Sequence, residues 1–270
     1  MACGAGAACQ TGHRLTRRAA AQTRSFQMIV QEESLTIMQQ LKASTQAQHD
    51  ATENGAFNEE LVKGRLPLNL YVESLGQLFL IHRALERRLR AFRAEMPALA
   101  RVLRDYQFQE TYLRNDLEFF GRNPEEIQPL DATRKFVAYI DRLADTTPMA
   151  LLGVHYVFEG SNNGSKFISR AVKKAYDLSD GKGTHYLDPY GDQQKQYWQA
   201  FKDDMNAVGF LPPETDAIVA AAGATFEAVM HLHRELYEGA ESKGSAHPAS
   251  ATASAPAAAK PAGKCPFHHG

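Results

Sequence analysis

The sequence predicts an all-α protein with a single domain, and three observations lead to this fold class. Apolar residues recur at steps of three and four residues along several segments, as they do on one face of a helix. No sustained alternation of apolar and polar residues lies between turn signals, so strands are not expected. Of the 270 residues, 44% are hydrophobic and 23% are charged, which is ordinary usage for a globular protein.

Helices are expected throughout the body of the chain, residues 34–240. The first contains Ile37, Leu41 and Thr45 on one face and should end at the Asn54-Gly55 pair. The second has charged residues on one side and a regular face on the other. That face is formed by Leu78, His82, Leu85, Leu89 and Phe92.

The later helices are marked by their boundaries as well as by periodicity. The segment 148–177 should begin near Thr147-Pro148, because proline is well tolerated in the first turn of a helix. Two more helices are expected at 193–209 and 214–238, with Leu211-Pro212-Pro213 between them. No repeat of 20–50 residues is present, so a solenoid is not expected.

Two tails differ from the body in composition. Residues 1–31 contain arginine but no acid and no clear apolar stretch, so we interpret them as a flexible N-terminal extension. An organelle transit segment and a start codon placed too early are the alternatives. Residues 241–263 are mostly Ala, Ser, Pro and Gly, which is typical of a linker. A short tail, residues 264–270, follows the linker and contains Cys265 and Pro266.

Composition argues against several classes of function. The formal net charge of −1 gives no signature of nucleic-acid binding. No apolar run approaches the ~18 residues of a membrane-spanning helix, so we expect no membrane insertion and a cytoplasmic location. The cysteines are Cys3, Cys9 and Cys265, all in the tails. The body therefore has no thiol for a disulfide, a zinc–thiolate site or a cysteine nucleophile.

Familiar catalytic motifs are missing from the sequence. It has no phosphate-binding glycine loop, dinucleotide fingerprint, His-Glu-x-x-His motif or nucleophile elbow. His231 and His233 are two residues apart, so on a helix they point in different directions. We expect one of them on the surface and the other partly buried, rather than a metal-binding pair.

The segment from Leu41 to Glu53 carries the first candidate site. On a helix, His49 shares a face with Thr45, Lys42 and Glu53. A neutral imidazole is a good axial ligand for haem iron. Lys42 lies two turns earlier on the same side, which suits a cation that reaches a haem propionate. The alternative is a structural histidine on a half-apolar helix.

The segment from Tyr156 to Ile168 carries the second candidate site. Gly160 and Gly164 each cost about 1 kcal/mol relative to alanine inside a helix, so their presence requires a reason. Both lie on one face and expose backbone there. A flat ligand can then approach closely, and simple packing against another helix is the alternative.

Together these segments resemble the haem oxygenase family across most of the body, in the order and spacing of its motifs. LKASTQAQHDATE looks like that family's proximal-helix motif, with His49 at the iron-ligand position and Lys42 at a basic position used for a propionate. YVFEGSNNGSKFI resembles the distal helix, with Gly160 and Gly164 at its paired glycines. The Glu-Gly-Ser-Asn form is similar to the Gram-negative bacterial branch.

A later helix and one departure complete the resemblance. QYWQAFKDDMN is similar to the family's helix that carries basic propionate partners, which makes Lys202 the candidate. Another branch of the family has an aspartate directly after the first distal glycine, where it organises waters, and here that position is Ser161. The resemblance therefore implies a differently built water network, with Asn162 or Asn163 as candidates.

The resemblance implies that haem is both substrate and prosthetic group, bound between the proximal and distal helices. Dioxygen and electrons from a separate reductase or ferredoxin would cleave it to biliverdin, carbon monoxide and ferrous iron. The residues implied as catalytic are Gly160, Ser161, Asn162 and Gly164. Those implied in cofactor binding are His49, which would ligate the iron, Lys42, Glu53 and Lys202.

Two features lie outside the main motifs. Cys265-Pro266 resembles haem-regulatory Cys-Pro motifs, and it is either a possible regulatory haem site or an incidental cysteine. His155 precedes Gly160 by five residues, and it either faces the edge of the site or packs in the interior.

Two other classes of function stay open at this point. A haem-binding sensor or carrier without turnover would fit Ser161 and the Cys-Pro tail. Another enzyme on the same helical fold is also conceivable. Thiaminase-like enzymes use a cysteine nucleophile, however, and the body has none. His49 in its motif argues against the PQQ-synthesis branch.

Overall fold

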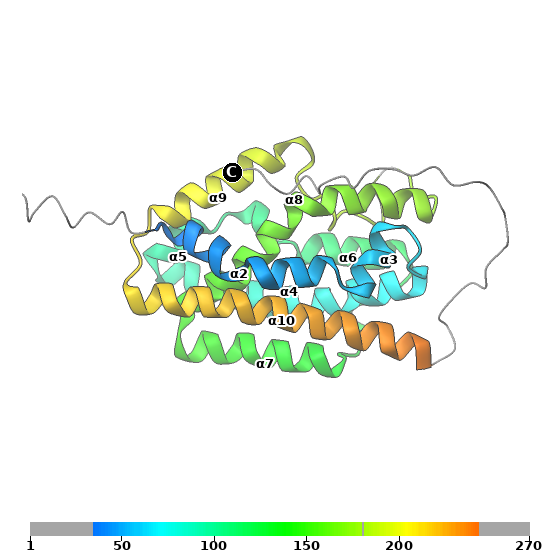
Figure 1. The fold of residues 1–270 in the computed structure, drawn as a ribbon, viewed down its shortest axis with the longest axis horizontal. Coiled ribbons are helices and arrows are strands. Elements are labelled where there is room, and N and C mark those ends of the chain that lie inside the picture. The colour runs from blue at the N-terminus through cyan, green and yellow to red at the C-terminus, as the bar shows by residue number, and fades with distance from the viewer. Residues whose placement is uncertain (1–34, 180, 243–270) are drawn as a thin grey trace, which may run out of the picture. The chain divides into compact units, whose positions relative to one another are not determined.

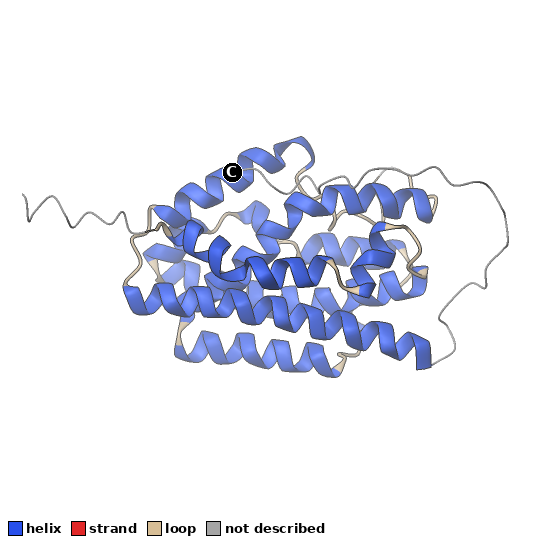
Figure 2. Cartoon of the chain, in the orientation of Figure 1, coloured by secondary structure: helices blue, strands red, loops and turns tan. Residues whose placement is uncertain are grey.

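The computed structural model describes residues 35–179 and 181–242. The chain divides into a unit of residues 1–36 and a unit of residues 37–270, and the description below concerns the second. In the described ranges every regular element is a helix, which confirms the all-α prediction (Figures 1 and 2). The α-helices are α2 (Ile37–Glu53), α3 (Ala56–Val62), α4 (Leu68–Glu95), α5 (Pro97–Val102), α6 (Glu110–Phe119), α7 (Asp131–Thr146), α8 (Leu151–Ala175), α9 (Gln194–Asn206) and α10 (Pro212–Ser242). Short 3₁₀ helices are η1 (Asp105–Gln107), η2 (Pro124–Glu126), η3 (Pro148–Ala150) and η4 (Gly191–Gln193).

The expected helices are present, with shifted boundaries. Pro148 begins the 3₁₀ turn η3, and α8 starts only at Leu151, while Thr147 makes no side-chain cap. Pro212 and Pro213 lie in the first turn of α10 rather than between two helices. The Leu211 N–H donates to Glu214 Oε2 at 2.8 Å, which satisfies an otherwise free backbone donor at this helix start.

The structure corrects one domain boundary and leaves others outside its range. Helix α10 continues to Ser242, so the predicted start of the linker at residue 241 is too early. The remainder of that linker, the N-terminal extension 1–31 and the tail 264–270 with Cys265 and Pro266 lie outside the described residues. No helix in the described part of the chain is long and apolar enough to cross a membrane.

Helices α3, α5, α6 and α7 were not expected from the sequence. In α7 the buried positions Thr133, Phe136, Ile140 and Ala144 follow helical spacing, but polar residues separate them closely enough to hide the pattern. The start of α6 depends on a distant residue. Glu86 of α4 accepts the backbone N–H groups of Gln109 and Glu110 at 2.6 and 2.9 Å. A carboxylate at a helix N-terminus satisfies free donors and complements the helix dipole.

Helices α4 and α10 organise the core. Figure 1 shows α10 lying between α2 and α7, and it also packs extensively against α8. Helix α4 packs against α6 and α7. The interior is apolar, which is the main source of stability for such a domain. Fully buried members include Leu41, Phe79, Ile81, Leu89, Leu113, Ile140, Leu152 and Phe201.

Gly153 sets the distance between α8 and α10. A Cβ atom at this position would lie 2.0 Å from the Ile218 carbonyl oxygen and 2.9 Å from the Ala222 nitrogen, both backbone atoms of α10. Only a glycine lets the two helix backbones approach this closely. The contact fixes the first turn of α8, and therefore the register of the downstream glycines, against the longest helix.

Asp116 holds the segment that connects α8 to α9. This fully buried carboxylate accepts the backbone N–H groups of His185 and Tyr186, each at 2.9 Å, and His185 Nδ1 at 3.0 Å. Tyr71 adds a hydrogen bond from its hydroxyl to the Gly183 carbonyl at 2.8 Å. These bonds fix the segment that carries Tyr190 to α8.

Candidate functional site

His49 lies on the last full turn of α2 with its side chain about one-third exposed. Its ring meets Phe226 of α10 edge-on, with 5.9 Å between ring centroids. The Nε2 atom is 3.5 Å from Glu53 Oε1, and Nδ1 is 3.5 Å from Asp50 Oδ1. The structure thus joins His49 and Glu53 as the sequence predicted, and it adds Asp50. These three side chains form a compact group with the chemistry of metal ligands.

Two contacts join α8 to the α2–α3 segment. The side-chain hydroxyl groups of Tyr156 on α8 and Thr45 on α2 lie in polar contact. At the other end, Gly64 lies against the last turn of α8, where an added Cβ would be 3.0 Å from Ala175 Cβ. Thr45 precedes His49 by one helical turn, and Tyr156 precedes Gly160 by one turn.

The candidate residues lie along the chain between these contacts. His49 and Glu53 follow Thr45 on α2, and Gly160 and Gly164 follow Tyr156 on α8. We name this set of residues, with Thr45 and Tyr156, the α2–α8 site. Both helices pack mainly on α10 rather than on each other, so α10 is the support of the site.

The face of α8 that carries Gly160 and Gly164 has no side chains at these two positions and is only partly covered. Gly160 and Gly164 are half-buried and lie one turn apart. A Cβ at Gly160 would meet the ring of Trp198 at 3.4 Å, an ordinary contact distance. Phe167 continues this face one turn later, and 53% of it is exposed. An exposed aromatic ring beside two glycines is apolar surface that a flat ligand can cover.

The other two residues predicted as catalytic do not share this face. Ser161 is exposed, and its hydroxyl donates to the Phe158 carbonyl of its own helix at 2.7 Å. Asn162 is 2% exposed, and its Nδ2 atom has no hydrogen-bond partner. Because successive helical residues are rotated by about 100°, Asn162 projects to the side opposite Gly160. The structure therefore does not bring all four residues together.

The two predicted cations lie near one end of the site. The Met38 N–H donates to Asn206 Oδ1 at 3.3 Å and joins the start of α2 to the end of α9. Lys42 follows Met38 by one turn, and Lys202 precedes Asn206 by one turn. Lys42 is exposed and Lys202 is half-buried. Each therefore lies one turn from the same inter-helix contact.

Three further histidines lie outside the α2–α8 site, two of them packed against other side chains and one on the surface. His155 is buried, and its Nε2 atom is 3.3 Å from Gln107 Oε1, so it packs in the interior. His231 is exposed, whereas His233 is partly buried and stacks on Phe57 with ring centroids 4.4 Å apart. Burial lowers the pKa of both His155 and His233 to about 4. The expectation for the 231/233 pair is confirmed.

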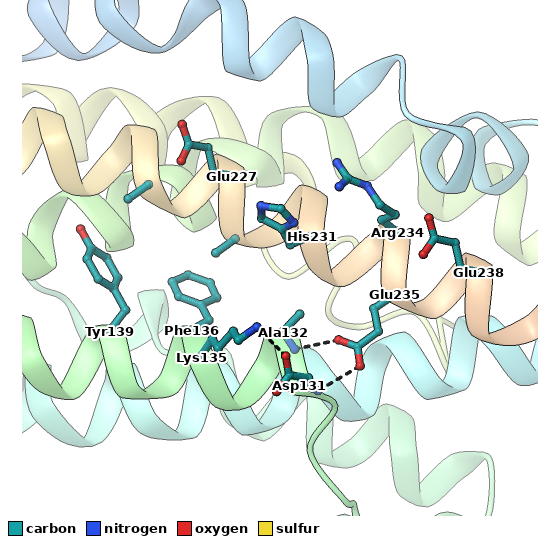
Figure 3. Close-up of a pocket in the computed structure, with 12 residues that line it drawn as sticks. Asp131, Ala132, Lys135, Phe136, Tyr139, Glu227, His231, Arg234, Glu235 and Glu238 are labelled. Carbon is teal, nitrogen blue, oxygen red and sulfur yellow. Dashed lines mark hydrogen bonds and ion pairs between the residues drawn. The ribbon is translucent and has the colours of Figure 1, made fainter.

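A pocket between α7 and α10 contains none of the predicted site residues. Figure 3 shows that three of its charged side chains, Asp131, Lys135 and Glu235, interact with one another or with backbone. Lys135 pairs with Asp131 at 2.6 Å, and Glu235 accepts the N–H groups of Asp131 and Ala132 at 3.0 and 2.7 Å. These interactions cap the start of α7, so the pocket has a structural explanation.

Sequence reasoning missed two parts of the site region. The Thr45–Tyr156 contact joins residues 111 positions apart, so the local periodicity of the sequence could not predict it. Glu159 is 1% exposed and accepts the Tyr190 hydroxyl at 2.8 Å. A glutamate on a predominantly apolar helix directly before Gly160 was a signal that the motif comparison passed over.

Comparison with known proteins gives a consistent family. Residues 35–235 match the family model described as Heme oxygenase. Heme oxygenase 2 of Oryctolagus cuniculus is 29% identical over 202 residues, which cover 73% of this chain and 64% of that relative. Heme oxygenase 1 of Synechocystis sp. is 25% identical over 206 residues, which cover 75% of this chain and 85% of that relative. The matched part of this chain thus spans less than two thirds of the mammalian relative's length.

Solved structures share the fold. Heme oxygenase-1 of the cyanobacterium Synechocystis, crystallised with heme, superposes with a TM-score of 0.71 at 24% identity and covers 77% of this chain and 96% of that one. The heme oxygenase of Leptospira interrogans gives a TM-score of 0.70 at 23% identity, with 74% and 100% covered. The family model extends from the segment just before α2 into α10 and includes every element of the α2–α8 site. This chain therefore belongs to the heme oxygenase family.

Proposed function

We propose that this chain binds haem at the α2–α8 site and cleaves it with dioxygen and reductant to biliverdin, carbon monoxide and ferrous iron. Family membership supports the reaction class. The observation that carries the location is the polar contact between the side chains of Thr45 and Tyr156. It joins α2 and α8 one turn before His49 and one turn before Gly160.

The residues present fit a haem in their chemistry. His49 offers a partly exposed imidazole with a carboxylate 3.5 Å from each ring nitrogen, and an imidazole oriented by a carboxylate is a good iron ligand. Phe167 offers uncovered apolar surface on the glycine face of α8. Lys42 and Lys202, near the Met38–Asn206 contact, suit the two carboxylates of the ligand. When bound, haem supplies the iron and the meso carbon that react with dioxygen.

Each chain residue then has a role that its position supports. His49 would hold the iron, and Glu53, whose Oε1 lies 3.5 Å from Nε2, orients the imidazole. Gly160 and Gly164 present backbone without side chains, which would let a macrocycle approach α8 closely. Ser161 gives the site no carboxylate, and its hydroxyl is engaged with Phe158. Water organisation on this side therefore falls to backbone groups and neighbouring polar side chains.

Mixing the chain with one equivalent of hemin tests the proposal. Ascorbate or a reductase system is added in air, and the visible spectrum is followed. We expect the Soret band to disappear while a biliverdin band grows, and chromatography then identifies the cleaved meso position. A Soret band that persists under reductant in air would refute turnover and favour a sensor or carrier. The absence of any haem complex would refute the site itself.

The His49→Ala variant tests the iron ligand. We expect a changed ferric haem spectrum and a large loss of turnover, with little change in the stability of the fold because the ring is partly exposed. His231→Ala, an exposed histidine on α10, is the matched control. Turnover and a haem spectrum in His49→Ala equal to those of the unmodified chain would contradict the assignment.

Several finer expectations stay predictions. The electron donor, a reductase or ferredoxin, is proposed from the reaction, which consumes electrons that the chain does not supply. The cytoplasmic location and the placement in the Gram-negative bacterial branch also stay predictions. So does the regulatory role of Cys265 and Pro266.

A further inference from the structure

A buried polar cluster lies beside α8, next to Gly160. Glu159 is 1% exposed, and its Oε2 atom accepts the hydroxyl of Tyr190 at 2.8 Å. The same hydroxyl is 3.5 Å from Gln109 Nε2. Gln107, two residues earlier, binds His155 on the preceding turn of α8. We call these residues, Glu159, Tyr190, Gln107, Gln109 and His155, the Glu159 cluster.

The cluster contains more buried polar atoms than it has partners for. Glu159 Oε1, Gln109 Oε1 and Gln107 Nε2 are all buried without a hydrogen-bond partner, and so is Nδ2 of Asn162 on the next turn of α8. An unpaired buried polar group costs about 1–3 kcal/mol, and several in one region are rarely tolerated. A buried water makes about three hydrogen bonds, so donors and acceptors gathered in this way are suited to internal water.

No cation compensates Glu159. Among the described residues, no lysine, arginine or histidine forms an ion pair with its carboxylate. A buried carboxylate without a cation is expensive, so such a group takes up a proton instead. Burial raises the pKa of Glu159 to about 7, although the hydrogen bond from Tyr190 acts in the opposite direction. The carboxyl group therefore exchanges its proton near neutral pH.

The surroundings of Glu159 contain few groups that titrate in the same range. Tyr190 and Tyr106 have raised pKa values because of burial, and the negative charge of Glu159 adds to the effect. His155 is held neutral by burial. The titratable groups around the Glu159 cluster, by element, are Tyr106 on η1, Tyr197 on α9, and His82 with Glu86 on α4, which act on His155.

We propose that Glu159 is a positioning residue for haem cleavage, holding internal water and an exchangeable proton beside Gly160. Reduction of dioxygen consumes protons, so a proton source beside the site has a use. In the step, the carboxyl O–H bond of Glu159 breaks and the proton passes to internal water. A proton from bulk solvent later restores the acid, so no oxidant or reductant is needed. This inference rests on the proposed function.

The position of Glu159 separates this network from the Ser161 side of α8. Residues 159 and 161 project about 100° to either side of Gly160. On the Ser161 side the hydroxyl is engaged with its own helix, whereas the Glu159 side leads into the buried cluster. Asn163 lies between Glu159 and the glycine face, and its Nδ2 atom donates to the Gly160 carbonyl at 2.9 Å. Ser161 lacks the carboxylate with which an aspartate would organise water. The water network is therefore assigned to the Glu159 side of α8.

Infrared difference spectroscopy on the haem-free chain tests the site without turnover. We expect a carboxylic acid carbonyl band that titrates near pH 7 and is missing in Glu159→Gln. Tyr190→Phe removes a donor that favours the ionised form, so the midpoint of the band should rise. Glu118→Gln, an exposed glutamate on α6, is the matched control and should leave the band unchanged. A missing band, or a midpoint that does not rise in Tyr190→Phe, would overturn the proposal.

The haem complex supplies the second readout. Binding of hemin should shift the midpoint of the Glu159 band, because Glu159 directly precedes Gly160 and the cluster lies beside it. The rate of haem cleavage should fall as the pH rises through about 7 in the unmodified chain. The Glu159→Gln variant should lack this pH dependence. A purely structural glutamate would alter the rate but not the shape of the pH profile. A midpoint that hemin does not shift in the unmodified chain would overturn the role. So would a pH profile of Glu159→Gln equal to that of the unmodified chain.

The two proposals fail in different ways. If the chain degrades haem but shows no Glu159 band, the role of Glu159 is refuted and the proposed function stands. If the band titrates as expected but haem survives reductant in air, the proposed function is refuted. In that case Glu159 still titrates as an internal acid, but its proposed role in haem cleavage is refuted together with the proposed function.

Discussion

Gly153 and Gly160 lie on the same helix and should respond oppositely to substitution by alanine. At Gly153 the new methyl group would lie 2.0 Å from the Ile218 carbonyl oxygen and 2.9 Å from the Ala222 nitrogen. Both are backbone atoms of α10, so neither can rotate away. At Gly160 the methyl group would meet the Trp198 ring at 3.4 Å, which requires little adjustment. The pair separates a glycine needed for folding from a glycine available to a ligand.

The magnitudes follow from packing and helix propensity. Overpacking costs ~1–3 kcal/mol even where side chains can shift, and at Gly153 α8 would have to move by more than an ångström from α10. Alanine offsets about 1 kcal/mol of this through better helix propensity. We expect Gly153→Ala to lose about 2 kcal/mol or more of unfolding free energy. Gly160→Ala should keep its stability or gain up to about 1 kcal/mol.

Urea unfolding and hemin titration of both variants measure the difference. Gly160→Ala should fold normally but bind hemin about tenfold more weakly or worse, since a methyl group between α8 and the macrocycle costs on the order of 1.4 kcal/mol. Gly153→Ala should bind hemin normally once folded. A Gly153→Ala protein as stable as the unmodified chain would refute the packing argument. Undiminished hemin affinity in Gly160→Ala would refute the contact between this glycine and haem.

Further predictions concern pH and the connection between α8 and α9. The pKa of His155 is about 4 in the fold and 6.5 unperturbed, so the unfolded chain alone takes up this proton between those pH values. Stability should therefore fall as the pH drops through this window, by about 1.4 kcal/mol per pH unit for this group. His155→Gln should reduce the slope in urea unfolding, and an unchanged slope would contradict the burial argument. Asp116→Ala leaves two backbone N–H groups without their acceptor, at ~1–3 kcal/mol each. Residues 184–190 should then exchange amide hydrogens faster, and unchanged protection would refute the anchoring role.

The order in which side chains recur along the sequence predicted much of the helical architecture. Leu78, Leu85 and Leu89 share a face because helical periodicity is local. In α4, Leu85 and Leu89 are buried and Leu78 is partly buried against the core, which confirms the predicted face. The start of α6 was not predictable in this way. It depends on Glu86, which lies 23 residues before Gln109 and caps that helix only in the folded chain.

For the site, the sequence by itself determined the candidates and the faces they share. His49, Thr45 and Glu53 lie on one face of α2, and Gly160 and Gly164 lie on one face of α8, because residues three and four apart are neighbours on a helix. The structure bears this spacing out.

Only the tertiary structure decided which residues from different helices meet. It placed Thr45 in contact with Tyr156 and brought Tyr190 to Glu159. It also turned Asn162 into the interior and placed Gly153 against α10. The physical reason is that periodicity is a property of a few consecutive turns. Contacts between distant segments instead depend on how whole helices pack, and that is decided by the shape and burial of every side chain in the interface.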